Sequence, residues 1–283
     1  MVVQTVFITD LDGTLLGHEE FDIMPSKPVL DKLIRGGIDI ILASSKTKAE
    51  IETLCDDLGY QLPFIYENGA GTAHFDKIHK AGAGSLVRPA DRGIPISDIQ
   101  ARWLQLIPSE MRQYCRFLDE MDRGAQKTLL GLRGADLDRA LRRSYSCLFV
   151  FTGSLTDFTA LQAQAKQAGL SVQRGGRVCT LSGHHNKAVY LPEIRCLTQQ
   201  GKQPSVLVGF GDSDNDKEML DAVDIACVIP RPDGYKLSVH KACHSAIIAP
   251  CVAPWGWHEA AVSALSLISE QTHCTEHKGA SYG

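Results

Sequence analysis

Short runs of apolar residues recur along this chain, and each is followed by a polar turn and then by apolar positions at helical spacing. Runs with no polar position are typical of strands that are buried on both faces of a parallel sheet. Alternation of such strands with helices predicts an α/β fold with a doubly wound parallel sheet. The predicted strands are Val6–Ile8, Ile38–Ala43, Phe64–Tyr66, Val206–Phe210 and Ile225–Ile229.

Helix signals fall between these strands. Pro28 follows Ser26 as in a capped first turn, and Thr47 with Glu50 has the spacing of a capping box. A helical pattern also runs from Lys187 to Leu197. The polar stretch after Glu270 is expected to fray.

The alternation stops in the middle of the chain, where residues 94–181 predict an α+β insert. We therefore expect a core made of residues 1–80 and 183–283, interrupted by a domain at 81–182. Glycine and charged residues from Ala81 to Gly93 suggest a hinge. A domain inserted in this way can close over a site as a lid.

Carboxylates follow two of the predicted strands. Asp10 and Asp12 come directly after the first strand, and Asp212 and Asp216 follow Val206–Phe210. Ligands of open α/β sheets bind at the carboxyl ends of the strands. Carboxylates held so close together are costly unless a cation lies between them, and a hard divalent ion suits oxygen ligands. An Asp-Gly turn on a solvated loop is the ordinary alternative for Asp12.

Ser44 ends the second predicted strand, directly before a predicted helix. Backbone N–H groups at a helix N-terminus bind anions. Taken alone, Ser44 is an ordinary helix-entry serine; beside the aspartate pair it indicates a phosphate ligand.

Two motifs, DLDGT at residues 10–14 and GDSDND at 211–216, resemble those of the haloacid-dehalogenase superfamily of aspartate-nucleophile phosphatases. Within that superfamily the chain resembles the mannosyl-3-phosphoglycerate phosphatase family. The stretches that carry this narrower resemblance are TDLDGTLL, SSKT at 44–47, FIYENGA at 64–70, RRSYS at 142–146, QRGGRV at 173–178, GFGDSDND and PWGWHEA at 254–260.

The resemblance implies a mechanism and a Mg²⁺ cofactor. Asp10 would be the nucleophile that forms an aspartyl-phosphate, and Asp12 the general acid and base. Asp10, the backbone carbonyl of Asp12 and Asp212 would bind Mg²⁺, with Asp216 as a further ligand or a support. The residues that would hold the phosphate are Thr14, Ser44 and Lys187. The insert would be the cap domain that many members carry.

The chain departs from the family pattern at the third motif, which is a lysine near a helix start. Alignment on Ala188 puts His185 at the lysine position, with Lys187 two residues later. We favour Lys187, because two aspartates and a phosphate require a permanent positive charge. His185 stays open as the alternative.

A glycosyl-3-phosphoglycerate presents a phosphate, a carboxylate and a sugar ring. Lys46 and a cap arginine could pair with the carboxylate, and sugar hydroxyls could bind to Glu67 and Asn68. The candidate arginines are Arg142, Arg143 and Arg177. Each is equally well explained as a solvated surface charge. Mannosyl and glucosyl substrates differ by one epimeric hydroxyl, so the sequence does not distinguish them; the family favours mannosyl, in mannosylglycerate synthesis.

Composition argues against some classes of partner, whereas the small phosphorylated substrate is what the resemblance implies. The net charge of −4 and pI near 6.2 argue against nucleic acid. No stretch has the roughly 20 apolar residues that span a membrane, and we expect no signal peptide. Nine scattered cysteines without a CxxC pair suggest free thiols in the cytoplasm. The sequence does not indicate the oligomeric state.

Three other functions stay open. A phosphatase of sucrose phosphate or a hexose phosphate would share the aspartate mechanism but not the predicted substrate contacts of the cap. A phosphomutase would share Asp10 and Asp12 but return the phosphate to its substrate. A non-catalytic sugar-phosphate-binding module is less consistent with an intact set of Asp10, Asp12, Ser44 and Asp212.

Overall fold

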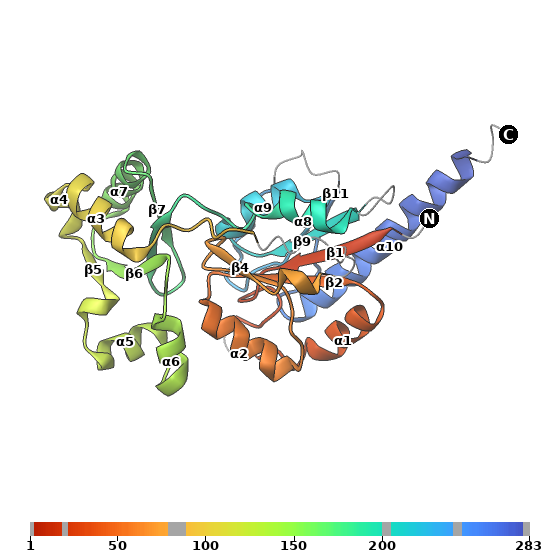
Figure 1. Cartoon of the computed structure of the whole chain (residues 1–283), viewed down its shortest axis with the longest axis horizontal. Helices are drawn as coiled ribbons and strands as arrows, with labels where there is room; N and C mark the ends of the chain where they lie inside the picture. Colours follow the sequence, from red (N-terminus) through yellow and green to blue (C-terminus); the bar gives the residue numbers. More distant parts are fainter. Residues whose placement is uncertain (1–2, 19–21, 79–88, 200–204, 240–244, 280–283) are drawn as a thin grey trace.

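The computed structural model of the chain describes residues 3–18, 22–78, 89–199, 205–239 and 245–279. Two units, each with its own sheet, lie side by side along the long axis of the molecule (Figure 1). The larger unit holds both ends of the described chain. The smaller unit consists of the middle of the chain. Residues 81–88 of the predicted hinge lie outside the described residues.

The larger unit contains a seven-stranded sheet with the order β11-β10-β9-β1-β2-β3-β4. All neighbouring strands are parallel except β3 and β4, which are antiparallel. The strands are β1 (Gln4–Thr9), β2 (Asp39–Ala43), β3 (Phe64–Tyr66), β4 (Gly71–Ala73), β9 (Ser205–Gly211), β10 (Ile225–Val228) and β11 (Ser245–Ile248).

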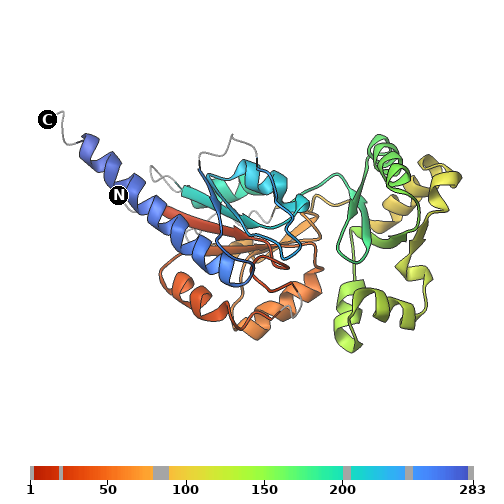
Figure 2. The same cartoon turned by 180° about the vertical axis from the view of Figure 1, so that it is seen from behind.

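Helices cover both faces of this sheet, which explains the apolar runs Val6–Ile8, Ile40–Ala43 and Val206–Val208 in its strands (Figures 1 and 2). Phe7 faces α1 (Lys27–Arg35), α2 (Lys48–Leu58) and α10 (Trp255–Gly279), while Val6 and Ile8 belong to the cluster on the other face. That second cluster is completed by α8 (Leu191–Thr198) and α9 (Lys217–Ala222). The α/β fold class predicted from the sequence is confirmed.

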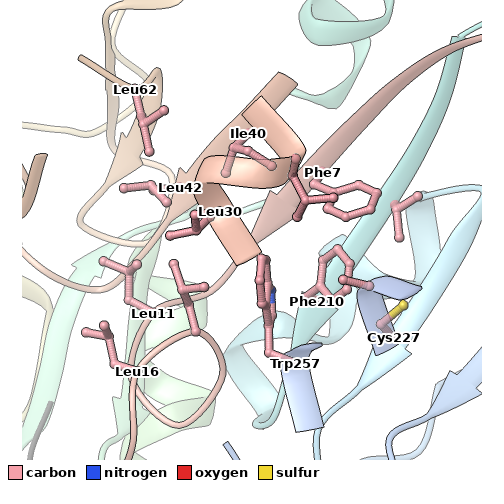
Figure 3. Packing of buried hydrophobic residues seen from close by; sticks show 14 of the residues in the cluster. Phe7, Leu11, Leu16, Leu30, Ile40, Leu42, Leu62, Phe210, Cys227 and Trp257 are labelled. Carbon is pink, nitrogen blue, oxygen red and sulfur yellow. The ribbon is translucent and has the colours of Figure 1, made fainter. Parts of the chain in front are cut away.

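Trp257 connects the last helix to the carboxyl end of β1. Its ring is fully buried and lies 5.6 Å from the ring of Phe210, which lies 4.9 Å from Phe7 (Figure 3). Burying an aromatic side chain of this kind contributes about 1.5–3 kcal/mol. The indole N–H donates to the hydroxyl of Thr9 at 3.1 Å, and this contact supports the end of β1.

The smaller unit contains a four-stranded antiparallel sheet with the order β5-β6-β8-β7. Apolar residues of α3 and α7 pack on one face of it, and a smaller cluster around Leu118, Met121 and Leu148 lies on the other. The elements are α3 (Ile96–Leu106), α4 (Ser109–Arg112), β5 (Cys115–Phe117), α5 (Arg123–Leu130), α6 (Gly134–Leu141), β6 (Ser146–Phe151), α7 (Leu155–Gln167), β7 (Leu170–Arg174) and β8 (Cys179–Gly183).

Two helix predictions need correction. The predicted helix at Lys187 begins instead at Leu191, because Lys187 lies in a turn before it and its side chain contacts Asp10 and Asp216. The stretch after Glu270 continues α10 to Gly279, whose first half is anchored through Trp257. Among the described residues, no helix has the length and apolar content needed to cross a membrane.

Candidate active site

Asp10 and Asp212 are brought together by strand pairing. β1 and β9 are parallel neighbours with Thr9 opposite Phe210, and the Asp10 N–H donates to the Phe210 carbonyl at 2.9 Å. The two acidic loops therefore leave the same edge of the sheet. Asp10, Asp212 and Asp216 are all buried, and each offers an oxygen within 4.8 Å of the others.

Lys187 lies between two of these carboxylates. Its ammonium nitrogen is 2.5 Å from Asp10 Oδ1 and 2.7 Å from Asp216 Oδ1, and its side chain is fully buried. Burial alone would lower the pKa of Lys187, but the two carboxylates outweigh burial and raise it. The lysine therefore stays charged, and it fastens the first acidic loop to the second.

The carboxylates still outnumber the ammonium groups at this site. Burial, and next the Asp216 carboxylate, raise the pKa of Asp10 well above its usual range. The same two causes raise the pKa of Asp212 to about 7. Within the described part of the chain, one buried oxygen each of Asp12 and Asp212 has no hydrogen-bond partner. Excess negative charge and unpartnered oxygens are what a hard divalent cation would satisfy, so these residues fit Mg²⁺.

Asp216 also shapes its own loop. Its Oδ2 accepts the backbone N–H groups of Asp212 at 3.1 Å and Ser213 at 3.2 Å, while Oδ1 faces Lys187. The residue thus orients Asp212 and the lysine together. This geometry agrees better with a supporting role than with a ligand whose oxygens are free.

Asp12 is paired with Lys46, whose ammonium nitrogen lies 2.8 Å from Asp12 Oδ2. Burial alone would lower the pKa of Lys46, but Asp12 and Glu50 raise it. Gly13 next to Asp12 has φ of +82°, and a Cβ there would collide with His18 and approach Asp212. Glycine at this position therefore lets the first loop turn sharply against the second.

The two predicted hydroxyl ligands lie at the same edge of the sheet. The Thr14 hydroxyl is buried and has no hydrogen-bond partner among the described residues. The Ser44 hydroxyl accepts the Lys46 N–H at 3.2 Å. Both follow parallel strands that pair with each other, β1 and β2. They can therefore serve one anion from two loops.

Comparison with known proteins identifies the family of this chain. Residues 7–81 match the family model of haloacid dehalogenase-like hydrolases. A glucosyl-3-phosphoglycerate/mannosyl-3-phosphoglycerate phosphatase of Persephonella marina is 30% identical over 241 residues, covering 80% of this chain and 84% of that protein. The protein of the same name from Methanococcoides burtonii is 29% identical over 264 residues, covering 90% and 95%.

The chain belongs to the haloacid dehalogenase-like hydrolases. Its similarity to these relatives shows that the chain is a phosphatase, which is a phosphoric monoester hydrolase. The fold is shared with the sucrose-phosphatase of Synechocystis sp. PCC6803, solved with sucrose and phosphate, at a TM-score of 0.58 and 13% identity over 95% of this chain and 99% of that one. The resemblance noted from the motifs is confirmed.

Lys187 and His185, the two alternatives for the third motif of these hydrolases, lie in different places. Lys187 contacts Asp10, whereas the buried ring of His185 lies with Nε2 3.1 Å from the Glu67 carbonyl oxygen. Burial lowers the pKa of His185, so the imidazole is neutral near pH 7. The structure therefore puts Lys187, and not His185, next to Asp10.

Glu67 and Asn68, predicted to bind the sugar, instead contact other protein groups. The Glu67 carboxylate accepts hydrogen bonds from residues 144–146 of the smaller unit. Asn68 accepts from the Asn215 amide and donates to Gln173, both at 3.3 Å. Asn68 still borders the site, because Asn215 belongs to the second acidic loop.

The predicted arginines differ in position. Arg142 is exposed at the end of α6, and Arg177 donates to the Leu130 carbonyl within the smaller unit. Arg143 reaches the larger unit, where it donates to the Ser45 carbonyl at 3.3 Å. In this arrangement Arg143 is the arginine of the three that contacts the SSKT loop.

Sequence reasoning missed two groups beside Asp212. Arg231 Nη1 lies 3.7 Å and His18 Nε2 lies 3.9 Å from Asp212 Oδ2. Neither residue belongs to a recognisable motif, so no local signal pointed to them. Trp257 does lie in the PWGWHEA stretch, and its contact with Thr9 explains why a tryptophan far along the chain matters to the site.

Proposed function

We propose that this phosphatase hydrolyses a glycosyl-3-phosphoglycerate, as the names of its relatives suggest, with mannosyl-3-phosphoglycerate favoured and glucosyl-3-phosphoglycerate as the alternative. The observation that carries the chemistry is the buried Asp10–Lys187–Asp216 arrangement at the end of β1. The product would be a glycosylglycerate such as mannosylglycerate.

In the first step, a carboxylate oxygen of Asp10 attacks phosphorus, and the bond from phosphorus to the glycerate oxygen breaks. Asp12 gives its proton to that leaving oxygen. The product of this step is a phosphoaspartyl enzyme and the free glycosylglycerate. Lys46, 2.8 Å from Asp12, orients the Asp12 carboxyl group for this transfer.

In the second step, Asp12 takes a proton from water, and the water oxygen attacks phosphorus. The bond from phosphorus to Asp10 breaks, so inorganic phosphate leaves and both aspartates return to their starting state. Thr14 and Ser44 each supply a hydroxyl group to the phosphoryl oxygens, and Lys187 supplies a positive charge. In-line attack needs little more than this positioning and charge stabilisation.

Mg²⁺ would be held by Asp10, the Asp12 carbonyl and Asp212, with Asp216 as a support. When bound, it draws charge away from the phosphoryl oxygens. The excess of carboxylate over ammonium groups at the site supports this assignment.

We propose that residues 81–182 form the cap that reads the glycosyl part of the substrate, with 1–80 and 183–283 as the catalytic core. The second sheet with its own apolar cluster supports this division. Arg143 is well placed for the substrate carboxylate, because it extends from the cap to the SSKT loop. Arg142 and Arg177 remain candidates on the cap surface.

The test is phosphate release with Mg²⁺ and with EDTA, from mannosyl-3-phosphoglycerate, glucosyl-3-phosphoglycerate, sucrose 6-phosphate and simple hexose phosphates. We expect Mg²⁺-dependent turnover of a glycosyl-3-phosphoglycerate with the highest kcat/KM. A preference for hexose phosphates would contradict the substrate but keep the mechanism. A requirement for an activating bisphosphate would indicate a phosphomutase instead.

A further inference from the structure

The loop between β3 and β4, residues 67–70, contacts each segment that joins the cap to the core. On the first connection, the backbone N–H groups of Arg92 and Gly93 both donate to the Ala70 carbonyl, at 2.7 and 2.8 Å. Tyr190, just before α8, donates its hydroxyl to the same carbonyl at 3.3 Å. The loop is therefore an anchor for the start of the cap.

The second connection, residues 184–190, includes Tyr190 and also contacts Glu67 and Gly69 of the same loop. The His185 ring contacts the Glu67 carbonyl oxygen at 3.1 Å. Gly69 has φ of +100°, and a Cβ there would collide with the backbone of Asn186. The two chain connections between cap and core thus converge on four consecutive residues.

A third contact comes from inside the cap. The Glu67 carboxylate accepts the Ser144 N–H at 2.9 Å, the Tyr145 N–H at 3.0 Å and the Ser146 hydroxyl. Ser146 is the first residue of β6, which lies between β5 and β8 in the cap sheet. A carboxylate of the core therefore holds the beginning of an inner strand of the cap.

This arrangement has two features that are energetically unfavourable unless other contacts compensate for them. Glu67 is 3% exposed, and a buried carboxylate needs its hydrogen bonds. Glu67 and Asn68 have φ of +46° and +57°, a conformation that is unfavourable for residues with a Cβ. In this conformation the Glu67 carboxylate contacts residues 144–146 of the cap.

We infer that Glu67 is a positioning residue, which sets the placement of the cap over Asp10 and thereby lets the cap read the part of the substrate remote from phosphorus. It does so through Ser144, Tyr145 and Ser146, and not by binding the sugar. The inference rests on the proposed function, because a cap that reads the glycosyl group must be held in register with the catalytic aspartate.

The dependence of the loss on substrate size separates this role from general support of the fold. A small substrate such as 4-nitrophenyl phosphate needs Asp10 and Mg²⁺ but little of the cap. A glycosyl-3-phosphoglycerate needs Asp10 and Mg²⁺ and also the cap. Loss of cap placement should therefore reduce kcat/KM for the large substrate selectively, while damage to the core would reduce both values alike.

The experiment compares Glu67→Gln, Ser146→Ala and a control, Asp138→Asn, with the wild type. Asp138 is an exposed cap carboxylate paired with Arg123. Gln keeps the shape of Glu67 but places an NH₂ group against a donor. For E67Q we expect kcat/KM for the glycosyl substrate to fall about 10- to 100-fold more than for 4-nitrophenyl phosphate. S146A, which loses one of three bonds, should show a smaller selective loss.

Hydrogen exchange supplies a readout that is independent of the substrate. The amides of Ser144 and Tyr145 should exchange faster in E67Q, with no change in the β2 peptide 39–43. Equal losses for both substrates would overturn the inference. So would a selective loss in E67Q with unchanged exchange and no effect of S146A, which would mean that Glu67 contacts the sugar directly.

If the wild type does not hydrolyse a glycosyl-3-phosphoglycerate, the proposed substrate is wrong and the exchange measurement decides the inference by itself. Faster exchange at Ser144 and Tyr145 in E67Q would then support the placement of the cap by Glu67. Unchanged exchange at those amides would overturn it.

Discussion

Core and cap differ in what they bury. The core buries aspartates, a glutamate, a histidine and a lysine, most of them at the ends of its parallel strands. Among the described residues of the proposed cap, 89–182, Ser146 and Ser182 are the buried polar side chains, and no carboxylate, lysine, arginine or histidine is buried. Buried charges lower the stability of a protein unless they are paired. The core therefore loses some stability to its buried charged groups, and the cap does not. Stability and activity should therefore be coupled in the core and separable in the cap.

The largest effect is expected for Asp10→Asn. The amide keeps the shape of the side chain but is a far weaker nucleophile, so turnover should fall by about 10⁴-fold or more. Phosphate release measures the loss, and circular dichroism should show an unchanged fold. Substantial residual turnover would rule out Asp10 as the nucleophile.

Lys187→Met should damage both stability and activity. It leaves Asp10 and Asp216 without their shared cation, and breaking a buried pair in this way costs about 3–5 kcal/mol in unfolding free energy. Urea denaturation measures that cost in metal-free protein. The control is Lys48→Met, which removes an exposed pair with Glu52 and should change stability by less than about 0.5 kcal/mol. Equal effects of the two variants would contradict the difference between core and surface charges.

Mg²⁺ should stabilise the core selectively. Free Mg²⁺ at 100 times its Kd contributes about 2.7 kcal/mol to the folded state, which corresponds to a rise in Tm of roughly 5–10 °C. Asp212→Asn should lose most of that rise, because it removes a buried ligand. Differential scanning calorimetry with MgCl₂ and with EDTA measures both. A full shift in the Asp212 variant would show that the ion binds elsewhere.

The smallest effects belong to the cap arginines. Arg142→Ala and Arg177→Ala remove charges from exposed positions, so unfolding free energy should change by less than about 1 kcal/mol. If either arginine meets the substrate carboxylate, KM for a glycosyl-3-phosphoglycerate should rise about 10-fold, with no change for 4-nitrophenyl phosphate. Arg143→Ala should exceed both, since Arg143 also contacts the core. A large loss of stability in R142A would contradict the expectation that stability and activity are separable in the cap.

Local patterns were sufficient for much of the fold. The strands that directly precede Asp10, Ser44 and Asp212 were predicted because a run of apolar residues depends only on burial of both sheet faces. β4 and β5 escaped prediction because these short edge strands carry no such run. β11 also escaped prediction, although Ala246–Ile248 is apolar. The helix predicted from Lys187 begins at Leu191, since tertiary contacts of Lys187 with Asp10 and Asp216 override the helical spacing.

The sequence by itself determined the α/β class, the family and the acidic loops, because apolar runs and short motifs report local conformation and the order of strand ends. Tertiary structure alone decided which long side chain reaches which partner. Lys187 and His185 lie two residues apart, yet one contacts Asp10 and the other the Glu67 carbonyl. Glu67 follows a core strand but binds the cap 77 to 79 positions later in the chain. Such contacts depend on the packing of distant segments, which no local spacing encodes.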